Sequence, residues 1–414
     1  MTLSTLAWLD FAERDRRRML DVVNLFRQQD TRDELGIGSL RDAFSELLFP
    51  GSSTIQTRAR YFLFVPWLYQ YREERLRWSA TRSSIPQLMR DYEIELISHL
   101  EKGGESEGVI GIDARRHLQR LPSSIYWSGL ARWGIRRFDM SIAEYHRWLA
   151  GMPKGAERVW TDDDGEPVAG HATQRWDPAI PPPPDDWLDQ LTFRLRAEEA
   201  EYLRERVLAT CPETLLAYLI DRTEPVDRTV SFVWMHPQLA AFPGRLRAQI
   251  EHARLASLVM NGAAWLYNVM LAEAQGSGDA AETYRVALDE WALALLDDEA
   301  AIRRWDYHDM WRLLAEGAIA IGRRTQHFVS SWSDLMTGRR LWDGLADDPG
   351  ARTIIAERER ELKRGRSRLD NRRLLDLWTG PSGVGRLHYR WNPVVRDTVN
   401  DMLLGLARGT VDGA

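Results

Sequence analysis

The stretch RLRAQIEHARLASLVMNGAAWLYNVMLAEA, residues 245–274, decides the fold class. Its apolar residues recur at steps of three and four, as from Leu255 to Leu258 and Val259, and from Trp265 and Leu266 to Val269, and so form one stripe along a helix. Gly262 lies within this stripe, where the missing side chain admits a close neighbour. The spacing predicts a long helix that buries one face.

The same periodicity recurs along most of the chain, beginning with a basic helix over residues 10–29. Ser141 and Glu144 have the spacing of a helix capping box. Only residues 229–235 and 387–391 resemble strands, and Asp164-Gly165 resembles a hairpin turn. We therefore expect a mostly α protein with a few short strands.

Four consecutive prolines, Pro181 to Pro184, interrupt the helical pattern. Such a run favours a stiff extended conformation and cannot continue a helix. We expect two helical lobes: an N-terminal domain over residues 1–177, a linker over 178–184, and a C-terminal domain over 185–414.

The composition is that of an ordinary globular protein. Of the 414 residues, 44% are hydrophobic and 28% are charged, which argues against disordered, collagen-like and membrane proteins. The longest apolar run, Tyr61 to Tyr69, contains Pro66 and is far shorter than the roughly 20 residues of a membrane span. A single cysteine, Cys211, cannot form an internal disulfide. We expect a cytoplasmic protein without membrane contact and without a cofactor.

Tryptophan is unusually frequent, with 18 Trp against 11 Phe and 12 Tyr. Trp is favoured at partner interfaces and at base-stacking surfaces because it joins a large apolar area to one N–H donor. Packing inside helical cores explains the same number, and we regard it as the commoner explanation.

Residues 48–64 form the most site-like stretch. Hydroxyl residues precede an expected helix whose first turns carry two arginines; the residues are Ser52, Ser53, Thr54, Arg58 and Arg60. Backbone amides, hydroxyls and guanidiniums at a helix start bind anions, with phosphate the expected one. Ser and Thr before a helix can also serve only as N-cap residues that start the helix. No Walker loop occurs, since the chain lacks Gly-Lys-Ser/Thr.

The strongest basic patch is residues 351–373, with nine basic and four acidic side chains in a chain of net charge −6. Its glutamates alternate with arginines at first and can pair with them along a helix. Beyond Lys363 few acids remain, and the arginines there suit phosphate contacts: Arg364, Arg366, Arg368, Arg372 and Arg373. A solvated helix face is the simpler alternative.

Catalytic signals are weak. Arg247 precedes His252, and Arg303 precedes His308, at the spacing that helical ribonucleases of the HEPN fold use. With nine histidines and so many arginines, roughly one such match is expected by chance. No set of metal-ligand residues stands at a suitable spacing, so we expect no metal site.

Several passages resemble an uncharacterised bacterial domain-of-unknown-function family. They are LGIGSLRDAFSELLFPGSSTIQTRARYFLFVPWLYQ, RRFDMSIAEYHRWL, NGAAWLYNVMLAEA and YRWNPVVRDTVNDMLLGL, which together span almost the whole chain. The resemblance implies a role beside restriction and phage-defence genes and brings no catalytic residue with it.

We therefore expect a non-enzymatic component of a defence or DNA-processing assembly. It would bind nucleic acid, a protein partner from a neighbouring defence gene, or both. The alternatives are a metal-independent ribonuclease or toxin-like effector that uses an Arg and His pair, and a purely structural adaptor.

Overall fold

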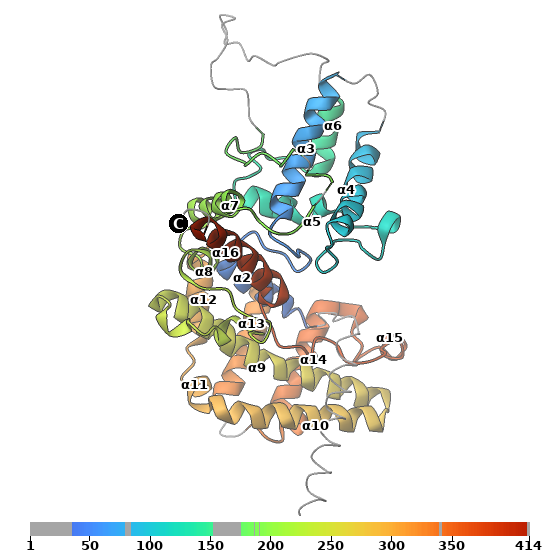
Figure 1. The fold of residues 1–414 in the computed structure, drawn as a ribbon. Helices are drawn as coiled ribbons and strands as arrows, with labels where there is room; N and C mark the ends of the chain where they lie inside the picture. The colour runs from blue at the N-terminus through green and yellow to red at the C-terminus, as the bar shows by residue number, and fades with distance from the viewer. Residues whose placement is uncertain are drawn as a thin grey trace, which may run out of the picture. The chain divides into compact units, whose positions relative to one another are not determined.

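A computed structural model describes residues 35–78, 84–151, 175–185, 187–189, 191–338 and 342–411. The helix expected over residues 10–29 and the turn at Asp164-Gly165 lie outside the described residues. Within them the fold is mostly α-helical, as predicted (Figure 1). The only β pairing among the described residues is an isolated bridge between Arg136 and Trp176.

Neither segment expected as a strand forms one. Residues 229–235 are a turn followed by the short 3₁₀ helix η2 (Val233–Met235). Residues 387–391 are irregular up to the π-helical turn η7 (Trp391–Val395). Trp391 there donates from its indole N–H to the carbonyl of Val230 at 2.9 Å. A side-chain hydrogen bond, and not a β-ladder, therefore joins these two segments.

The chain divides into two compact units. Unit 1 comprises Met1–Phe44 and Arg247–His388, and unit 2 comprises Ser45–Leu246 and Tyr389–Ala414. These units do not coincide with the expected domains 1–177 and 185–414. The proline-rich segment 178–184 lies within unit 2, where Trp67 donates to the carbonyl of Pro181 at 2.8 Å.

Unit 1 is organised around α9 (Gly244–Gln275), which belongs to this unit from Arg247 onward. Its other helices, beside the first part of α2 (Gly38–Leu48), are α10 (Gly278–Ala294), η4 (Leu295–Asp298), α11 (Glu299–Arg303), α12 (Tyr307–Glu316), α13 (Arg323–Gly338), η5 (Leu345–Asp347), α14 (Pro349–Lys363), η6 (Arg364–Arg366) and α15 (Arg372–Leu375).

The expected close neighbour of Gly262 is Trp291 of α10. A β-carbon built at Gly262 would lie 2.1 Å from the Trp291 ring, so only glycine fits there. The Trp291 indole donates to the carbonyl of Leu258 at 3.0 Å, and Trp332 of α13 donates to that of Val259 at 2.9 Å. Both contacts fix neighbouring helices against α9, which confirms the long helix predicted from the sequence.

Unit 2 contains the rest of α2, the start of α9 and the remaining helices. They are α3 (Tyr61–Trp78), α4 (Ile85–Lys102), η1 (Arg115–His117), α5 (Pro122–Arg132), α6 (Ile142–Ala150), α7 (Ala197–Thr210), α8 (Leu215–Arg222), η2, η3 (Leu239–Ala241), η7 and α16 (Arg396–Val411). The capping box of Ser141 and Glu144 at the start of α6 is present as predicted.

Aromatic side chains fill the core of unit 2. Phe62 of α3 stacks on Trp133 with ring centroids 3.8 Å apart. Tyr69 packs against Trp127, Tyr145 and Trp176 at 5.5 to 6.0 Å. Among the described residues, five tryptophans belong to the largest fully buried side chains: Trp67, Trp133, Trp332, Trp342 and Trp391. For these five, core packing is the explanation.

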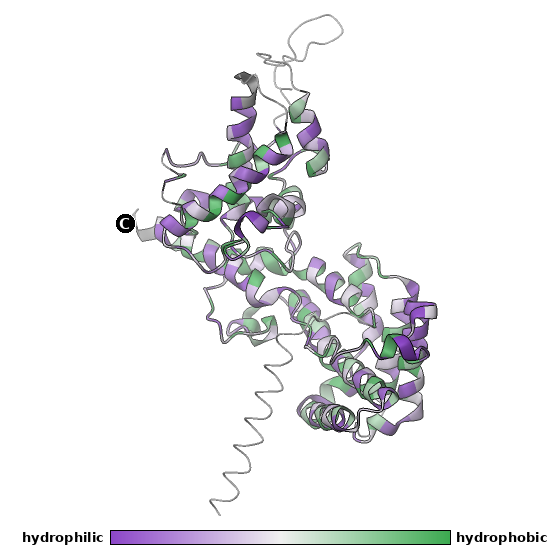
Figure 2. Cartoon of the chain, turned by 90° about the vertical axis from the view of Figure 1, so that its right-hand side faces the viewer, coloured by the Kyte–Doolittle hydropathy of each residue, from purple (hydrophilic) through white to green (hydrophobic). Residues whose placement is uncertain are grey.

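The hydropathy pattern agrees with this packing. Hydrophobic and hydrophilic residues alternate along the helices of both units (Figure 2). Among the described helices, one, α9, is long and apolar enough to cross a membrane by composition, yet 94% of its most apolar window is buried inside the structure. That burial is typical of a core helix.

Candidate phosphate-binding surface

Arg60 is buried in unit 2 and forms an ion pair. Its guanidinium donates to Glu199 of α7 at 2.8 Å and to the carbonyl of Thr192 at 2.8 Å, and only 8% of its side chain is exposed. Glu199 has no exposed surface and also accepts from Arg196 at 2.7 Å. The Arg60 guanidinium therefore joins the start of α3 to α7 and is not available to a solvent phosphate.

Arg58 is held in a similar way by α16. Its guanidinium makes a two-pronged contact with Asp401, at 2.7 and 2.9 Å, and the backbone amide of Ala59 donates to the same carboxylate at 3.0 Å. Both arginines precede α3, which begins at Tyr61, so they do not lie on its first turns as expected. A carboxylate neutralises each of them.

The hydroxyl residues of this stretch have local structural roles. The Ser52 hydroxyl donates to the carbonyl of Phe49 at 2.6 Å, and the Ser53 amide donates to Gln56 at 3.1 Å. Thr54 is exposed. The structure thus keeps the stretch together as a turn before α3 but directs its guanidiniums into ion pairs.

The basic segment of unit 1 has different surroundings. We call residues 363–373, which run from the last residue of α14 through η6 to the start of α15, the basic loop. Arg364, Arg366 and Arg373 are exposed, and no carboxylate of the described residues lies within ion-pair distance of them. Arg372 is also exposed but pairs with Asp376 at 3.0 Å, and Arg368 is half-buried.

Nearby acids are already engaged by other arginines. Asp370, the one acid of the basic loop, pairs with Arg360 at 2.8 Å. Glu361 contacts Arg324 at 3.3 Å and Arg358 at 3.4 Å. A hollow lined by Arg324 and residues 361–366 lies at the end of α14. The local field at this hollow is therefore positive although the whole chain is acidic.

A buried carboxylate fixes the shape of the basic loop. Glu359 of α14 is completely buried and accepts five hydrogen bonds. The donors are the Tyr267 hydroxyl (2.7 Å), the Ser367 hydroxyl (2.7 Å), the backbone amides of Arg368 (2.9 Å) and Leu369 (3.1 Å), and the Lys363 ammonium (3.2 Å). All four donor residues that follow Glu359 belong to the basic loop, so the loop is tied to α14.

The hydrogen bonds also keep Glu359 ionised. Burial raises the pKa of its carboxyl, but the hydrogen bonds from Tyr267, Ser367 and the two backbone amides outweigh burial and bring the pKa below its usual value. Sequence reasoning assigned this glutamate to helical pairing with arginines and missed its role. Its donors at Tyr267 and Ser367 come from other parts of the chain, so no local pattern indicates it.

The two sets of predicted phosphate contacts belong to different units: Arg58 and Arg60 to unit 2, and the basic loop to unit 1. Each set therefore has to be judged by its own surroundings. Of these two sets of arginines, only the set in the basic loop contains exposed guanidiniums.

The structure places the two Arg and His pairs of the ribonuclease alternative in different surroundings. His252 accepts from the Trp305 indole at Nδ1 (3.0 Å), so Nε2 carries the proton that it shares with Asp309 at 3.2 Å. Both ring nitrogens are thus occupied by structural partners. His308 is exposed, and Arg303 pairs with Glu299 at 2.7 Å. Arg247 is exposed and makes no ion pair with a described residue.

Among the described residues, no group of three or more His, Cys, Asp or Glu side chains is placed to hold a metal ion. Cys211 is buried and has a free thiol, and burial raises the pKa of that thiol.

The sequence matches a family model over residues 3–400, and the chain belongs to that family, whose description is "Family of unknown function (DUF6361)". This confirms the resemblance to a domain-of-unknown-function family. Comparisons with curated proteins and with solved structures gave no significant match.

Proposed function

We propose that this protein is a non-enzymatic component of a defence or DNA-processing assembly and that it binds the phosphate backbone of nucleic acid through the basic loop. The observation that carries the proposal is the set of exposed guanidiniums at Arg364, Arg366 and Arg373, with no described carboxylate in ion-pair distance. Phosphate contacts of this kind supply most of the affinity in binding that is independent of base sequence.

The rigid backbone of the loop supports the same proposal. Glu359 binds Ser367, Arg368 and Leu369 by three hydrogen bonds, so the backbone next to the exposed arginines is held in one conformation. Less conformational entropy is lost when a pre-ordered surface binds its partner.

The test is the salt dependence of duplex and single-strand binding by the full chain. We expect log K to fall linearly with log salt, and the triple variant R364A/R366A/R373A to bind at least tenfold more weakly at low salt. Its slope should be shallower by about 3, or roughly 0.9 per duplex phosphate contact.

A matched control removes the same charge elsewhere. Arg116, Arg120 and Arg147 of unit 2 are exposed and make no ion pair with a described residue. The variant R116A/R120A/R147A should keep the wild-type slope. Equal losses in the two triple variants, or no binding at about 50 mM salt, would contradict the proposal.

The proposal also includes a protein partner encoded beside the gene. Affinity capture from the native host, followed by nuclease treatment, separates the two modes. A partner retained only through nucleic acid leaves after nuclease, whereas a directly bound partner stays.

A further inference from the structure

The hollow at the end of α14 contains one residue from another helix, Arg324 of α13. The hollow has a volume of about 430 Å³, and a ligand in solution can reach it because five of its seven lining residues are exposed: Arg324, Leu362, Arg364, Gly365 and Arg366. Of the lining residues, Glu361 is the one acid. Sequence reasoning did not select Arg324, which reaches the hollow from a separate helix.

The ion pair between Arg324 and Glu361 is loose. Its closest atoms, Nε of Arg324 and Oε1 of Glu361, are 3.3 Å apart, and 65% of the Arg324 side chain is exposed. Charge-assisted hydrogen bonds are shorter, at about 2.7–2.9 Å, as in the two-pronged contact of Arg58 with Asp401. Exposed ion pairs stabilise a fold little. Arg324 can therefore leave Glu361 at a small cost in free energy.

Glu361 has a second cation at its other carboxylate oxygen. Arg358, whose side chain is 1% exposed, lies 3.4 Å from Oε2 of Glu361. Arg358 itself donates to the carbonyl of Leu35 at 2.8 Å and to the Thr325 hydroxyl at 2.9 Å, so its position is fixed. The Glu361 carboxylate therefore keeps a charged partner when Arg324 moves away.

Neither charge of this pair is placed to stabilise its own helix. Arg324 is the second residue of α13, and Glu361 lies in the last turn of α14. A cation at a helix N-terminus and an acid at a helix C-terminus both meet the unfavourable end of the helix dipole. Removal of either side chain should therefore leave the fold intact.

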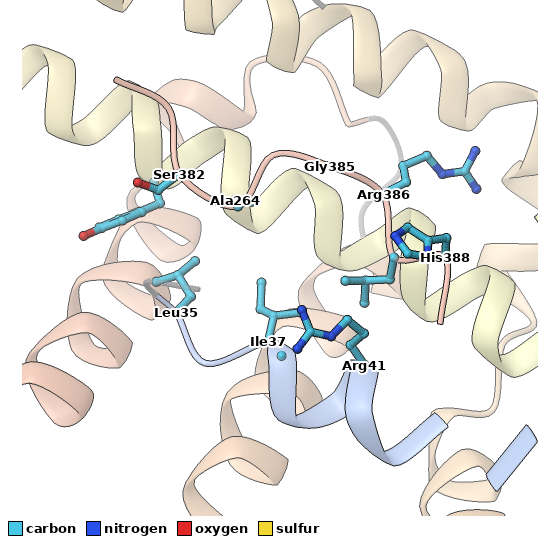
Figure 3. Close-up of a pocket in the computed structure, with 12 residues that line it drawn as sticks. Leu35, Ile37, Arg41, Ala264, Ser382, Gly385, Arg386 and His388 are labelled. Atoms are coloured by element: carbon cyan, nitrogen blue, oxygen red, sulfur yellow. The ribbon is translucent and has the colours of Figure 1, made fainter. Parts of the chain in front are cut away.

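Another pocket in unit 1 provides a contrast. Its volume is about 190 Å³, its lining comes from the start of α2, from α9 and from residues 382–388, and it shares no lining residue with the hollow. Two of its lining residues are arginines, but Figure 3 shows the guanidiniums of Arg41 and Arg386 pointing in opposite directions. This pocket therefore offers no shared cationic surface to a phosphate.

We infer that Arg324 is a further phosphate contact of the hollow and that Glu361 is an internal competitor for it. In the free protein Glu361 pairs with Arg324. When nucleic acid binds, a backbone phosphate takes the place of the carboxylate, and Arg324 joins Arg364 and Arg366. This role of Arg324 rests on the proposed function, because the competing anion is the phosphate backbone of nucleic acid. Such an autoinhibitory contact lowers the affinity for every base sequence alike, since phosphate contacts carry no sequence information.

Duplex binding by the full chain at about 50 mM salt tests the inference, with opposite signs for the two residues. Glu361→Gln removes the competitor and should tighten binding at least threefold. Arg324→Ala removes a phosphate contact and should weaken binding at least threefold, with a salt slope that is shallower by about 0.9. In the double variant R324A/E361Q, affinity should differ less than twofold from that of R324A, because the group for which Glu361 competes is gone.

Matched controls remove the same charges beside the hollow. Arg323 precedes Arg324 on α13, and Glu357 lies about one helical turn before Glu361 on α14. Both are exposed, do not line the hollow and make no ion pair with a described residue. The variants R323A and E357Q should each change the affinity less than twofold. Circular dichroism and the unfolding midpoint establish that every variant is folded.

Failure of this inference and failure of the proposed function give different results. Equal binding by the wild type and by R364A/R366A/R373A contradicts the proposed function, whereas the signs for E361Q and R324A decide the inference. If that triple variant is defective but E361Q binds no more tightly than the wild type, or R324A keeps wild-type affinity, the inference is overturned and the proposed function stands. An equal gain in E361Q and E357Q also overturns the inference, since it would indicate a general effect of charge. Absence of binding by both the wild type and E361Q contradicts both.

Discussion

The arginines before α3 and those after α14 have opposite surroundings although both sequences predict phosphate contacts. Arg60 and Arg58 meet carboxylates that lie 139 and 343 residues away along the chain. Arg364, Arg366 and Arg373 meet no described carboxylate. The difference teaches that local charge density alone does not predict a positive surface, because distant acids neutralise it in the fold.

The largest effect should come from breaking the buried pair of unit 2. Arg60→Ala leaves Glu199 buried with Arg196 as its remaining charged donor, so we expect a loss of about 3 kcal/mol in the free energy of unfolding. Chemical denaturation measures it. Arg194 in the same unit is exposed, and R194A should change stability by less than about 0.5 kcal/mol. A neutral R60A would mean that the pair is not formed in solution.

In unit 1 the corresponding buried group is an acid. Glu359→Gln places an amide N–H among donors, and two or more of the five hydrogen bonds are lost. We expect destabilisation by about 2 kcal/mol and weaker nucleic-acid binding, because the loop backbone loses its anchor. The exposed neighbour Glu357 supplies the control E357Q, which should be silent in both measurements.

Acid titration sharpens this prediction. The pKa of Glu359 is lower in the folded chain than its ordinary value of 4.5, so the folded state binds the proton less well than the unfolded state. Its contribution is therefore complete above about pH 4.5 and is lost as the pH falls through the folded pKa. The stability gap between wild type and E359Q should shrink below pH 4.5. A gap that is constant from pH 3 to 7 would show that ionisation of Glu359 contributes nothing.

A smaller loss is expected for Arg58→Ala. The Arg58 side chain is 25% exposed, so water replaces part of its interaction with Asp401, and the Ala59 amide still donates to that carboxylate. We expect a loss of about 1–2 kcal/mol, between the values for R60A and for the exposed control R194A. A double-mutant cycle with D401N measures the coupling between the two side chains. A coupling energy of zero would mean that Arg58, like the exposed arginines, adds no stability through an ion pair.

The sequence predicted much of the fold, because helices depend on local spacing. The apolar steps from Leu255 to Val269 and the capping box at Ser141 need only neighbours within one or two turns. The candidate site was predicted only in part. The shortage of acids along the basic loop predicted that its arginines would lack local ion pairs. The pairing of Arg58 with Asp401 and the burial of Glu359 instead depend on contacts between distant segments.

The smallest expected effect has the opposite sign. Arg364 adopts φ +51° and ψ −127°, a region that glycine enters freely and other residues enter at a cost. Arg364→Gly should therefore stabilise the fold by up to about 1 kcal/mol, whereas Arg364→Ala keeps the strain and should leave stability nearly unchanged. Both variants remove one phosphate contact and should reduce nucleic-acid affinity alike. Denaturation and salt titration of the two variants thus separate the effect of backbone strain from that of charge. Arg364 is expected to lower stability and to raise affinity for nucleic acid. Arg60, by contrast, is expected to raise stability only. Equal stability of R364G and R364A would mean that the left-handed conformation is not maintained in solution.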